Sequence, residues 1–305
     1  MNNPVFITGG SGLLALNWAL ALRARAVPVA LGLHDRTIAL AGVAASRVDL
    51  DSADAAARVL DAMAPRLVVH AAGMTSVEGC EADPAQAHQV NVMLAQHVAQ
   101  ACAARRIPLV QISTDHLVPG DRAMADENQP IGPRNVYART KAEAEVRVLE
   151  AHPGALVVRT NFYGWGSVYR QSFSERIAQA LRQSSPITLF TDVYYTPILA
   201  EALVDAVHEL VDRQASGVFH VVGDERLSKH EFGLRLARQF GLDAGLIRAG
   251  CLRDEPALVP RPSDMSLSNA KACGVLGRPL GNVDAHLARL RQQEQLGFSK
   301  ELQSL

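Results

Sequence analysis

The stretch that decides the fold is PVFITGGSGLLA, residues 4–15. The apolar run PVFIT (4–8) predicts a buried strand, and the residues after it predict a tight turn that opens a helix. Gly9, Gly12 and Ala15 give this turn the spacing G-x-x-G-x-x-A. Small residues here let the backbone approach a pyrophosphate, and the first turn of the helix supplies amide donors with a partial positive charge. The stretch therefore predicts a dinucleotide-binding turn.

The rest of the first half repeats this alternation. Apolar runs predict strands at 27–33, 66–72, 107–114 and 155–161, and amphipathic stretches predict helices at 13–26, 53–63, 84–106 and 135–152. Continuous apolar strands between helices are typical of a parallel sheet that is covered on both faces. We therefore expect the α/β class, with a Rossmann-type doubly wound parallel sheet.

After residue 161 the pattern changes. The segment FYGWGSVYRQSF is rich in glycine and aromatic residues and predicts a loop. Further elements are expected as helices at 174–183, 198–213 and 228–242, the last capped by Ser228, and as strands at 186–190 and 217–223. Prolines break the stretch 255–277 into predicted loops, and the tail beyond residue 296 is expected to be loosely ordered.

This change of pattern predicts two parts. Residues 1–161 are expected to form an NAD(P)-binding Rossmann domain, and residues 162–305 mostly a smaller C-terminal substrate-binding lobe. Segments near 190–222 are expected to return to the first domain.

The composition excludes several classes of partner. The 305 residues are 48% hydrophobic and 20% charged with a net charge of −1, so no basic excess suggests nucleic acid or a membrane surface. The N-terminus has no signal-peptide pattern, and no window of the sequence predicts a membrane span. We expect a chain of this size to act as a monomer or a homodimer.

Cysteine and histidine spacing gives no sign of a metal site. Cys80, Cys102, Cys251 and Cys273 are scattered without a CxxC pair, and the 10 histidines show no HExxH motif. Scattered cysteines argue against a disulfide framework and suit a reducing compartment. We therefore expect a cytoplasmic protein with no metal.

A candidate acid–base pair lies in NVYARTK, residues 135–141. Tyr137 and Lys141 are four positions apart on a predicted helix, hence on one face. A neighbouring cation lowers the pKa of a phenol, which fits it for proton transfer. The preceding strand ends in QISTD (111–115), where Ser113 and Thr114 bring hydroxyl groups to the edge at which doubly wound sheets bind ligands.

The end of the second predicted strand bears on the choice of cofactor. It reads GLHDR, with His34, Asp35 and Arg36. An acidic residue there favours NAD through a ribose hydroxyl, whereas a basic residue favours NADP through the 2′-phosphate. Both are present, and Arg36 tips the expectation slightly towards NADP. Asp49 is expected near the adenine amino group.

These residues together resemble the extended short-chain dehydrogenase/reductase superfamily. The similarity lies in TGGSGLLA, VVHAAGMTSV, Asn91-Val92, STD, YARTK and RTNFYGWG. Within the superfamily, HAAGMTSVEGCEADPAQAHQVN, ISTDHLVPG, YYTPILAEAL and RPSDMSLSNAKA are similar to segments of the dTDP-4-dehydrorhamnose reductase family. The resemblance covers nearly the whole chain.

The resemblance implies an NAD(P)H-dependent reductase of a nucleotide-linked 4-keto-6-deoxy sugar. Thr114, Tyr137 and Lys141 would carry the catalytic roles, and Asn91 would support the lysine. The expected cofactor-binding residues are Thr8, Gly9, Gly10, Ser11, Gly12, Leu13, Leu14, His34, Asp35, Arg36, Asp49, Leu50, Ala71, Ala72, Gly73, Asn91, Ser113, Tyr137, Lys141, Arg159, Thr160 and Asn161. The expected substrate-binding residues are Thr75, Thr114, Asp115, His116, Tyr163, Trp165 and Arg261.

The sequence departs from the family at a few positions. Ala138 replaces the glycine that usually follows the tyrosine, and His116 stands where the family often has a tyrosine. Two alternatives remain open: a sugar-nucleotide epimerase or dehydratase, and a non-catalytic cofactor-binding subunit that resembles the regulatory partner of methionine adenosyltransferase. A dehydratase would be expected to pair an acid with a base beside the threonine, and TDH offers Asp115 without the usual glutamate.

Overall fold

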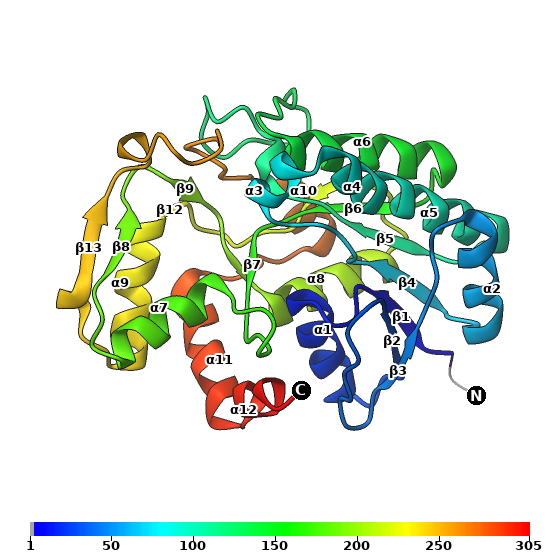
Figure 1. Ribbon diagram of the computed structural model, residues 1–305, viewed down its shortest axis with the longest axis horizontal. Helices are drawn as coiled ribbons and strands as arrows, with labels where there is room; N and C mark the ends of the chain where they lie inside the picture. Colours follow the sequence, from blue (N-terminus) through cyan, green and yellow to red (C-terminus); the bar gives the residue numbers. More distant parts are fainter. Residues whose placement is uncertain (1–2) are drawn as a thin grey trace.

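The computed structural model describes residues 3–305 and centres on a seven-stranded parallel sheet (Figure 1). The strand order is β11-β6-β5-β4-β1-β2-β3. The strands are β1 Val5–Thr8, β2 Val29–Leu33, β3 Ala44–Arg47, β4 Leu67–His70, β5 Leu109–Ile112, β6 Leu156–Arg159 and β11 Gly217–His220. The order reverses between β1 and β4, which is the arrangement of a doubly wound sheet. The predicted fold class is confirmed.

Helices cover both faces of this sheet. Successive residues of a strand point to opposite faces, so Val5 and Ile7 join the core under one set of helices and Phe6 joins the other. Helices α1 (Leu13–Arg23) and α8 (Ala200–Asp212) pack together on one face. The other face is covered by α2 Ala53–Met63, α5 Leu94–Arg105 and α6 Val136–Ala151.

The helix predicted at 84–106 is continuous but changes its winding. It begins as α4 (Pro84–His88), passes through the π-helical turn η1 (Gln89–Met93) and continues as α5. A short helix that the sequence did not predict, α3 (Val77–Ala82), precedes it. A π-helical turn widens the helix locally, and such turns often occur at functional sites.

A smaller group of elements lies at one end of the sheet, on the left in Figure 1. It contains α7 (Phe173–Arg182), α9 (Lys229–Phe240) and the parallel pair β8 (Ile187–Phe190) and β13 (Ile247–Gly250). The hydroxyl of Ser228 accepts a hydrogen bond from the backbone of Glu231, which confirms the predicted cap. Short pairs join this part to the sheet: β7 Phe162–Tyr163 with β10 Ile198–Leu199, and β9 Tyr194–Tyr195 with β12 Leu227–Ser228.

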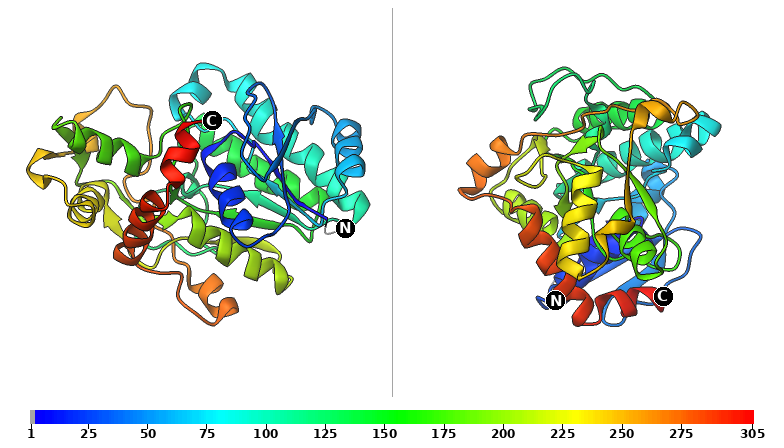
Figure 2. Two further views of the ribbon diagram at one scale, coloured as in Figure 1. Left: turned by 90° about the horizontal axis from the view of Figure 1, so that it is seen from below. Right: turned by 90° about the vertical axis from the view of Figure 1, so that its left-hand side faces the viewer.

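The C-terminal region is more ordered than the sequence predicts. It forms α10 (Ala270–Leu276), α11 (Val283–Gln295) and α12 (Phe298–Gln303). The expected loop over 270–276 and the expected loose tail are therefore wrong. Leu302 of α12 is fully buried, and Glu301 forms an ion pair with Arg23 of α1. Figure 2 shows the red C-terminal helices beside the blue helix α1.

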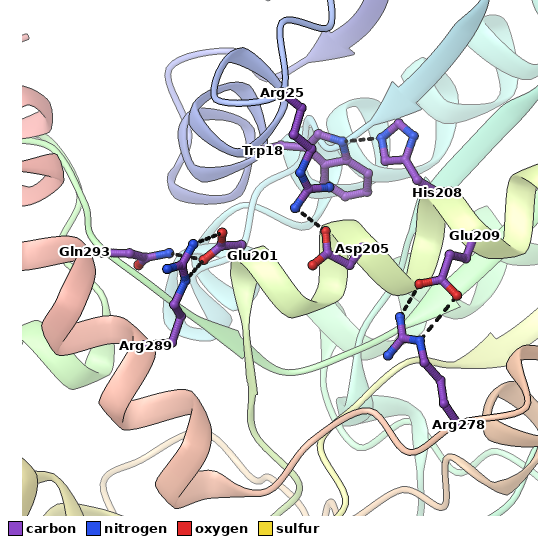
Figure 3. A network of polar contacts seen from close by, with 9 residues as sticks. All are labelled: Trp18, Arg25, Glu201, Asp205, His208, Glu209, Arg278, Arg289 and Gln293. Carbon is purple, nitrogen blue, oxygen red and sulfur yellow. Dashed lines mark hydrogen bonds and ion pairs between the residues drawn. The ribbon is translucent and has the colours of Figure 1, made fainter. Parts of the chain in front are cut away.

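Three carboxylates along α8 form ion pairs that connect this helix to neighbouring segments (Figure 3). Glu201, Asp205 and Glu209 are spaced by four residues and so lie in one row along the helix. Their ion-pair partners come from three separate segments, and are Arg289, Arg25 and Arg278 respectively. Trp18 of α1 donates an indole hydrogen bond to His208 of α8 at 3.0 Å. These contacts join the C-terminal segments to the central sheet.

Candidate active site

A cleft of about 510 Å³ opens where β1, β4 and β5 end. Parallel strands that end at one edge bring the loops after them together, which is where doubly wound sheets bind ligands. The sequence-predicted residues that line the cleft are Gly9, Ser11, Gly12, Leu13, Leu14, Arg36, Ala71, Ala72, Gly73, Thr75, Asn91, Ser113, Thr114, Asp115, His116, Tyr137, Lys141, Thr160 and Asn161. Residues that follow β1, β2, β4, β5 and β6 thus meet residues of α6 in one space.

The glycine turn forms one wall of the cleft. Gly9 has a φ of +67°, and a Cβ there would lie 2.8 Å from the backbone of Ala72, so a side chain would be both strained and obstructed. Gly12 is the N-cap of α1, and no side chain within residues 3–305 caps that helix. The first amide groups of α1 therefore remain available at the cleft. This arrangement fits the pyrophosphate of a dinucleotide.

Tyr137 and Lys141 reach the cleft from the first turns of α6. Asn135 caps this helix by accepting a hydrogen bond from the backbone of Ala138. The ring of Tyr137 packs edge-to-face on His116 with centroids 5.6 Å apart, and the Lys141 ammonium donates to the carbonyl of Ile112 at 2.6 Å. The carbonyl that holds Lys141 belongs to the strand that delivers Thr114. The helix and the strand end therefore position each other.

Burial dominates the electrostatics of this pair. It raises the pKa of Tyr137 to about 12, although a hydrogen bond with Thr114 acts in the opposite direction. It also lowers the pKa of Lys141 to about 8, against the attraction of Glu145. The expectation that Lys141 lowers the pKa of Tyr137 is corrected in this structure, because desolvation of the phenolate dominates and the cation that acts to lower the pKa is Arg170 rather than Lys141. Tyr137 accordingly keeps its proton at neutral pH.

Arg159 lies away from the cleft. Its guanidinium is buried in a two-point ion pair with Glu145, with contacts of 2.9 and 2.7 Å, and the hydroxyl of Ser113 donates to the same carboxylate. The predicted cofactor contact of Arg159 is thereby corrected. A buried guanidinium must keep its carboxylate partner, so this residue braces β6 against α6. Asn161, two residues further on, does line the cleft and donates to Asp115 at 2.5 Å.

Asn91 lies on the π-helical turn and joins the loop after β4 to α6 at the cleft. Its amide oxygen accepts from the backbone of Met74 at 2.8 Å, and its amide nitrogen donates to Met74 and to Thr140 of α6. The contacts of Asn91 are therefore to the loop after β4 and to α6. Direct contact with Lys141 is not among them.

Other predicted cofactor residues lie behind or beside the cleft. Thr8 is buried and hydrogen-bonded to His70 at 2.8 Å, and Gly10 packs against Leu31. These two support the turn without lining the cleft. His34, Asp49 and Leu50 line a second cavity of about 350 Å³ together with Arg47. Asp35 is exposed next to His34.

Three predicted substrate contacts lie elsewhere. Tyr163 packs against Phe232 in the core, and Trp165 is buried with its indole nitrogen donating to the carbonyl of Leu290. Arg261 forms an ion pair with Glu78, and neither residue lines the cleft. The substrate role expected for the two aromatic residues is corrected, because burial removes their rings from the cleft.

The sequence reasoning missed one wall of the cleft. The additional lining residues are Ala15, Val77, Ile112, Phe162, Arg170, Gln171, Ser172, Phe173 and Arg176. Five of these nine, Phe162 and residues 170–173, lie in the glycine- and aromatic-rich stretch that the sequence marks as a loop. Arg170 in this stretch and Arg176 just after it were the available signal, since four cationic side chains (Arg36, Lys141, Arg170, Arg176) line the cleft against the single carboxylate of Asp115. The cleft is therefore suited to anions.

Within residues 3–305, no group of three or more His, Cys, Asp and Glu side chains is placed to hold a metal ion. No helix in that range is both long and apolar enough to cross a membrane.

A Rossmann sheet whose glycine turn shares a cleft with a tyrosine and a lysine one helical turn apart defines an extended short-chain dehydrogenase/reductase. Within that class, the model of the RmlD substrate binding domain matches residues 2–295. The chain belongs to this family, the dTDP-4-dehydrorhamnose reductases and their relatives, and it is an oxidoreductase.

Two curated relatives illustrate the similarity. The probable low-salt glycan biosynthesis reductase Agl14 of Haloferax volcanii is 30% identical over 291 residues, which cover 93% of this chain and 96% of the relative. A dTDP-4-dehydrorhamnose reductase of Streptomyces griseus is 30% identical over 282 residues, which cover 88% and 87% of the two chains.

A solved structure agrees with the fold. The dTDP-4-dehydrorhamnose reductase of Bacillus anthracis in complex with NADP aligns with a TM-score of 0.84 at 21% identity, over 96% of this chain and 100% of the other.

Proposed function

We propose that the protein is an NAD(P)H-dependent reductase of a nucleotide-linked 4-keto-6-deoxy sugar. One observation carries the proposal: the glycine turn, the uncapped start of α1, Thr114, Tyr137 and Lys141 share a single cationic cleft. Both partners in the reaction would be anionic, which suits the charge of the cleft. The names of the two relatives above, a glycan biosynthesis reductase and a dTDP-4-dehydrorhamnose reductase, support the reaction type and the substrate class.

The cofactor would lie along the glycine turn and α1. The close approach at Gly9 and the uncapped amides of α1 would hold its pyrophosphate, and Arg36 would face the adenosine ribose. We propose NADP as slightly preferred over NAD, because Arg36 lines the cleft whereas Asp35 lies outside it. A bound reduced nicotinamide supplies the hydride for the keto carbon.

Residues of this chain would transfer the proton to the substrate. Tyr137, whose pKa of about 12 keeps it protonated, would donate its proton to the carbonyl oxygen, which becomes the product hydroxyl. The hydroxyl of Thr114 would hold that oxygen beside Tyr137. The Lys141 ammonium would stabilise the phenolate left behind. In this account Asp115 and His116 bound the sugar side. The elements after residue 161 form the substrate lobe, apart from α8 and β11, which belong to the central sheet and its covering helices.

The dehydratase alternative has less support. Asp115 neighbours Thr114, but its carboxylate oxygens are engaged by Thr114 and Asn161, and the next residue is His116 rather than a glutamate. A regulatory role has no supporting observation of its own. The cytoplasmic location and the monomeric or homodimeric state remain proposals from the sequence.

A substrate panel tests the proposal. Purified protein is mixed with NADPH or NADH and with nucleotide-linked keto sugars that differ in nucleotide and stereochemistry, and nicotinamide absorbance is followed. We expect oxidation with at least one 4-keto-6-deoxy sugar nucleotide. Dehydration of a nucleotide-linked hexose without consumption of reduced cofactor would replace the proposal with the dehydratase alternative.

A further inference from the structure

The segment between β7 and α7, residues 166–171 (GSVYRQ), crosses the cleft; we refer to it as the strap. Its base is fixed, because Asn17 of α1 donates to the carbonyl of Trp165 at 2.6 Å and Gln303 of α12 donates to the carbonyl of Gly166. Its other end runs into the buried cap of α7 at Ser172. Between these points Ser167 is still buried but residues 168–171 are exposed, and Tyr169 keeps 48% of its surface accessible.

The strap touches both sides of the glycine turn. Tyr169 stacks under the guanidinium of Arg36 at 5.1 Å, and Arg170 donates to the hydroxyl of Thr75 at 2.7 Å. Arg36 follows β2 and Thr75 follows β4, and in the sheet β1 lies between these two strands. A segment in contact with the loops after β2 and β4 therefore passes over the turn that follows β1.

The inner side of the strap belongs to the same cleft as that turn. Arg170 and Gln171 line it together with Gly9, Ser11 and Gly12. The Arg170 guanidinium has five donors, and the hydrogen bond to Thr75 uses one of its nitrogens. A cation held across from uncapped helix amides forms the second half of a phosphate site.

We propose that the strap completes the dinucleotide site: Arg170 binds the cofactor's phosphates from the side opposite α1, and Tyr169 holds Arg36 in place at the ribose end. Arg170 is a binding residue in this arrangement, and Tyr169 is a positioning residue. The strap must lift for the cofactor to leave, so it slows dissociation. This inference rests on the proposed function, because it takes the ligand of the glycine turn to be a nicotinamide dinucleotide.

Stopped-flow dissociation tests the inference directly. Protein loaded with NADPH is mixed with excess NADP⁺, and NADPH fluorescence reports the rate of release. We expect Arg170→Ala to release NADPH roughly 10- to 100-fold faster, the loss typical of one charge-assisted hydrogen bond. Thr75→Val, which breaks the link but keeps the cation, should give a smaller increase. Arg248→Ala on the distant strand β13 is the matched control and should leave the rate unchanged.

A second pair of variants separates the role of the Tyr169 ring from that of its hydroxyl group. Tyr169→Ala removes the contact with Arg36 and should speed release about 2- to 5-fold, whereas Tyr169→Phe keeps it and should match the wild type. Tyr169 is exposed, so both of its variants should fold. They keep the inference testable even where Arg170→Ala is unstable. In the strap variants KM for NADPH should rise by a larger factor than kcat falls.

Hydrogen exchange gives a readout independent of turnover. We expect NADPH to slow amide exchange in residues 166–171 of the wild type and to do so less in Arg170→Ala. Wild-type release rates in both Arg170→Ala and Tyr169→Ala, with no protection of this segment, would overturn the inference while leaving the reductase intact. Failure of the wild type to bind NADPH or NADH would instead overturn the proposed function, and the inference with it.

Discussion

At the scale of single residues, burial sets the protonation of the acid–base pair. Tyr137 and Lys141 are both buried, and burial favours the neutral form of each. It therefore raises the pKa of the phenol to about 12 and lowers that of the ammonium to about 8. A reductase needs its proton donor protonated, and Tyr137 meets that need over the whole physiological range. Lys141 is the member of the pair that titrates near neutrality.

The pH dependence of catalysis should follow Lys141. A lysine is charged below its pKa, so kcat/KM should fall as the pH rises through about 8. Lys141→Arg, which stays charged, should lose that decline even if its activity is lower. The matched variant is Lys229→Arg, because Lys229 also has a pKa lowered to about 8 but does not line the cleft. Persistence of the decline in Lys141→Arg would assign it to another group.

The sequence predicted single site residues correctly where these residues come directly after a strand of the sheet. Thr114 and the glycine turn were found because parallel strands bring their carboxyl ends to one edge, and Tyr137 because of its spacing from Lys141. Arg170 was missed because its place at the cleft depends on a loop after β7 that contacts the loops after β4 and β2, which local sequence does not reveal. Trp165 was misassigned because an aromatic residue in a glycine-rich loop looks the same in sequence whether it stacks on a ligand or fills the core.

At the scale of elements, Asn91 on the π-helical turn ties α6 to the loop after β4. Both ends of its amide are used, on Met74 and on Thr140. Local periodicity predicted one long helix here and gave no sign of the π-helical turn. It also failed for β3, whose four residues are all exposed, and for α12, which is ordered by contacts with α1 almost three hundred positions away.

Removing the amide of Asn91 should loosen both elements. Asn91→Ala leaves the half-buried backbone N–H of Met74 without its partner and its carbonyl with only the thiol of Cys80, so we expect a loss of about 1–3 kcal/mol in the free energy of unfolding. Urea denaturation measures this, and NADPH binding should weaken in parallel. The exposed Asn128→Ala is the control, expected within about 0.5 kcal/mol of the wild type. Equal stability of the two variants would contradict the bracing role.

At the scale of the whole molecule, α8 is the element that joins the sheet to the C-terminal helices. Three of its carboxylates each form an ion pair with an arginine (Figure 3). His208 adds a hydrogen bond with Trp18 that fixes the protonation state of its own ring. An indole N–H only donates, so the His208 nitrogen that accepts from Trp18 is unprotonated. Burial, helped by Arg66, lowers the pKa of His208 to about 4.

Acid should therefore weaken the fold through His208. The folded pKa of about 4 lies below the ordinary histidine pKa of 6.5, so the unfolded chain binds a proton first and stability falls as pH drops from 6.5 towards 4. Between pH 7 and pH 5, protonation of His208 in the unfolded chain should lower the free energy of unfolding by about 2 kcal/mol. His208→Gln can still accept from Trp18 but cannot be protonated, so its unfolding free energy should fall less. The exposed His34→Gln should behave as the wild type.

A comparable acid loss in wild type and His208→Gln would place the sensitivity elsewhere. His70 and His220 are the first candidates, because burial lowers their pKa values to about 3 and about 4.

The central claim is that the phenol of Tyr137 gives its proton to the substrate beside a bound nicotinamide. Tyr137→Phe tests it most directly, with turnover of the reducible sugar nucleotide and the Kd for NADPH measured on the same preparation. The account predicts an unchanged fold, a Kd within a few-fold of the wild type and a kcat lower by about 10²–10⁴-fold. Wild-type turnover in Tyr137→Phe would contradict it.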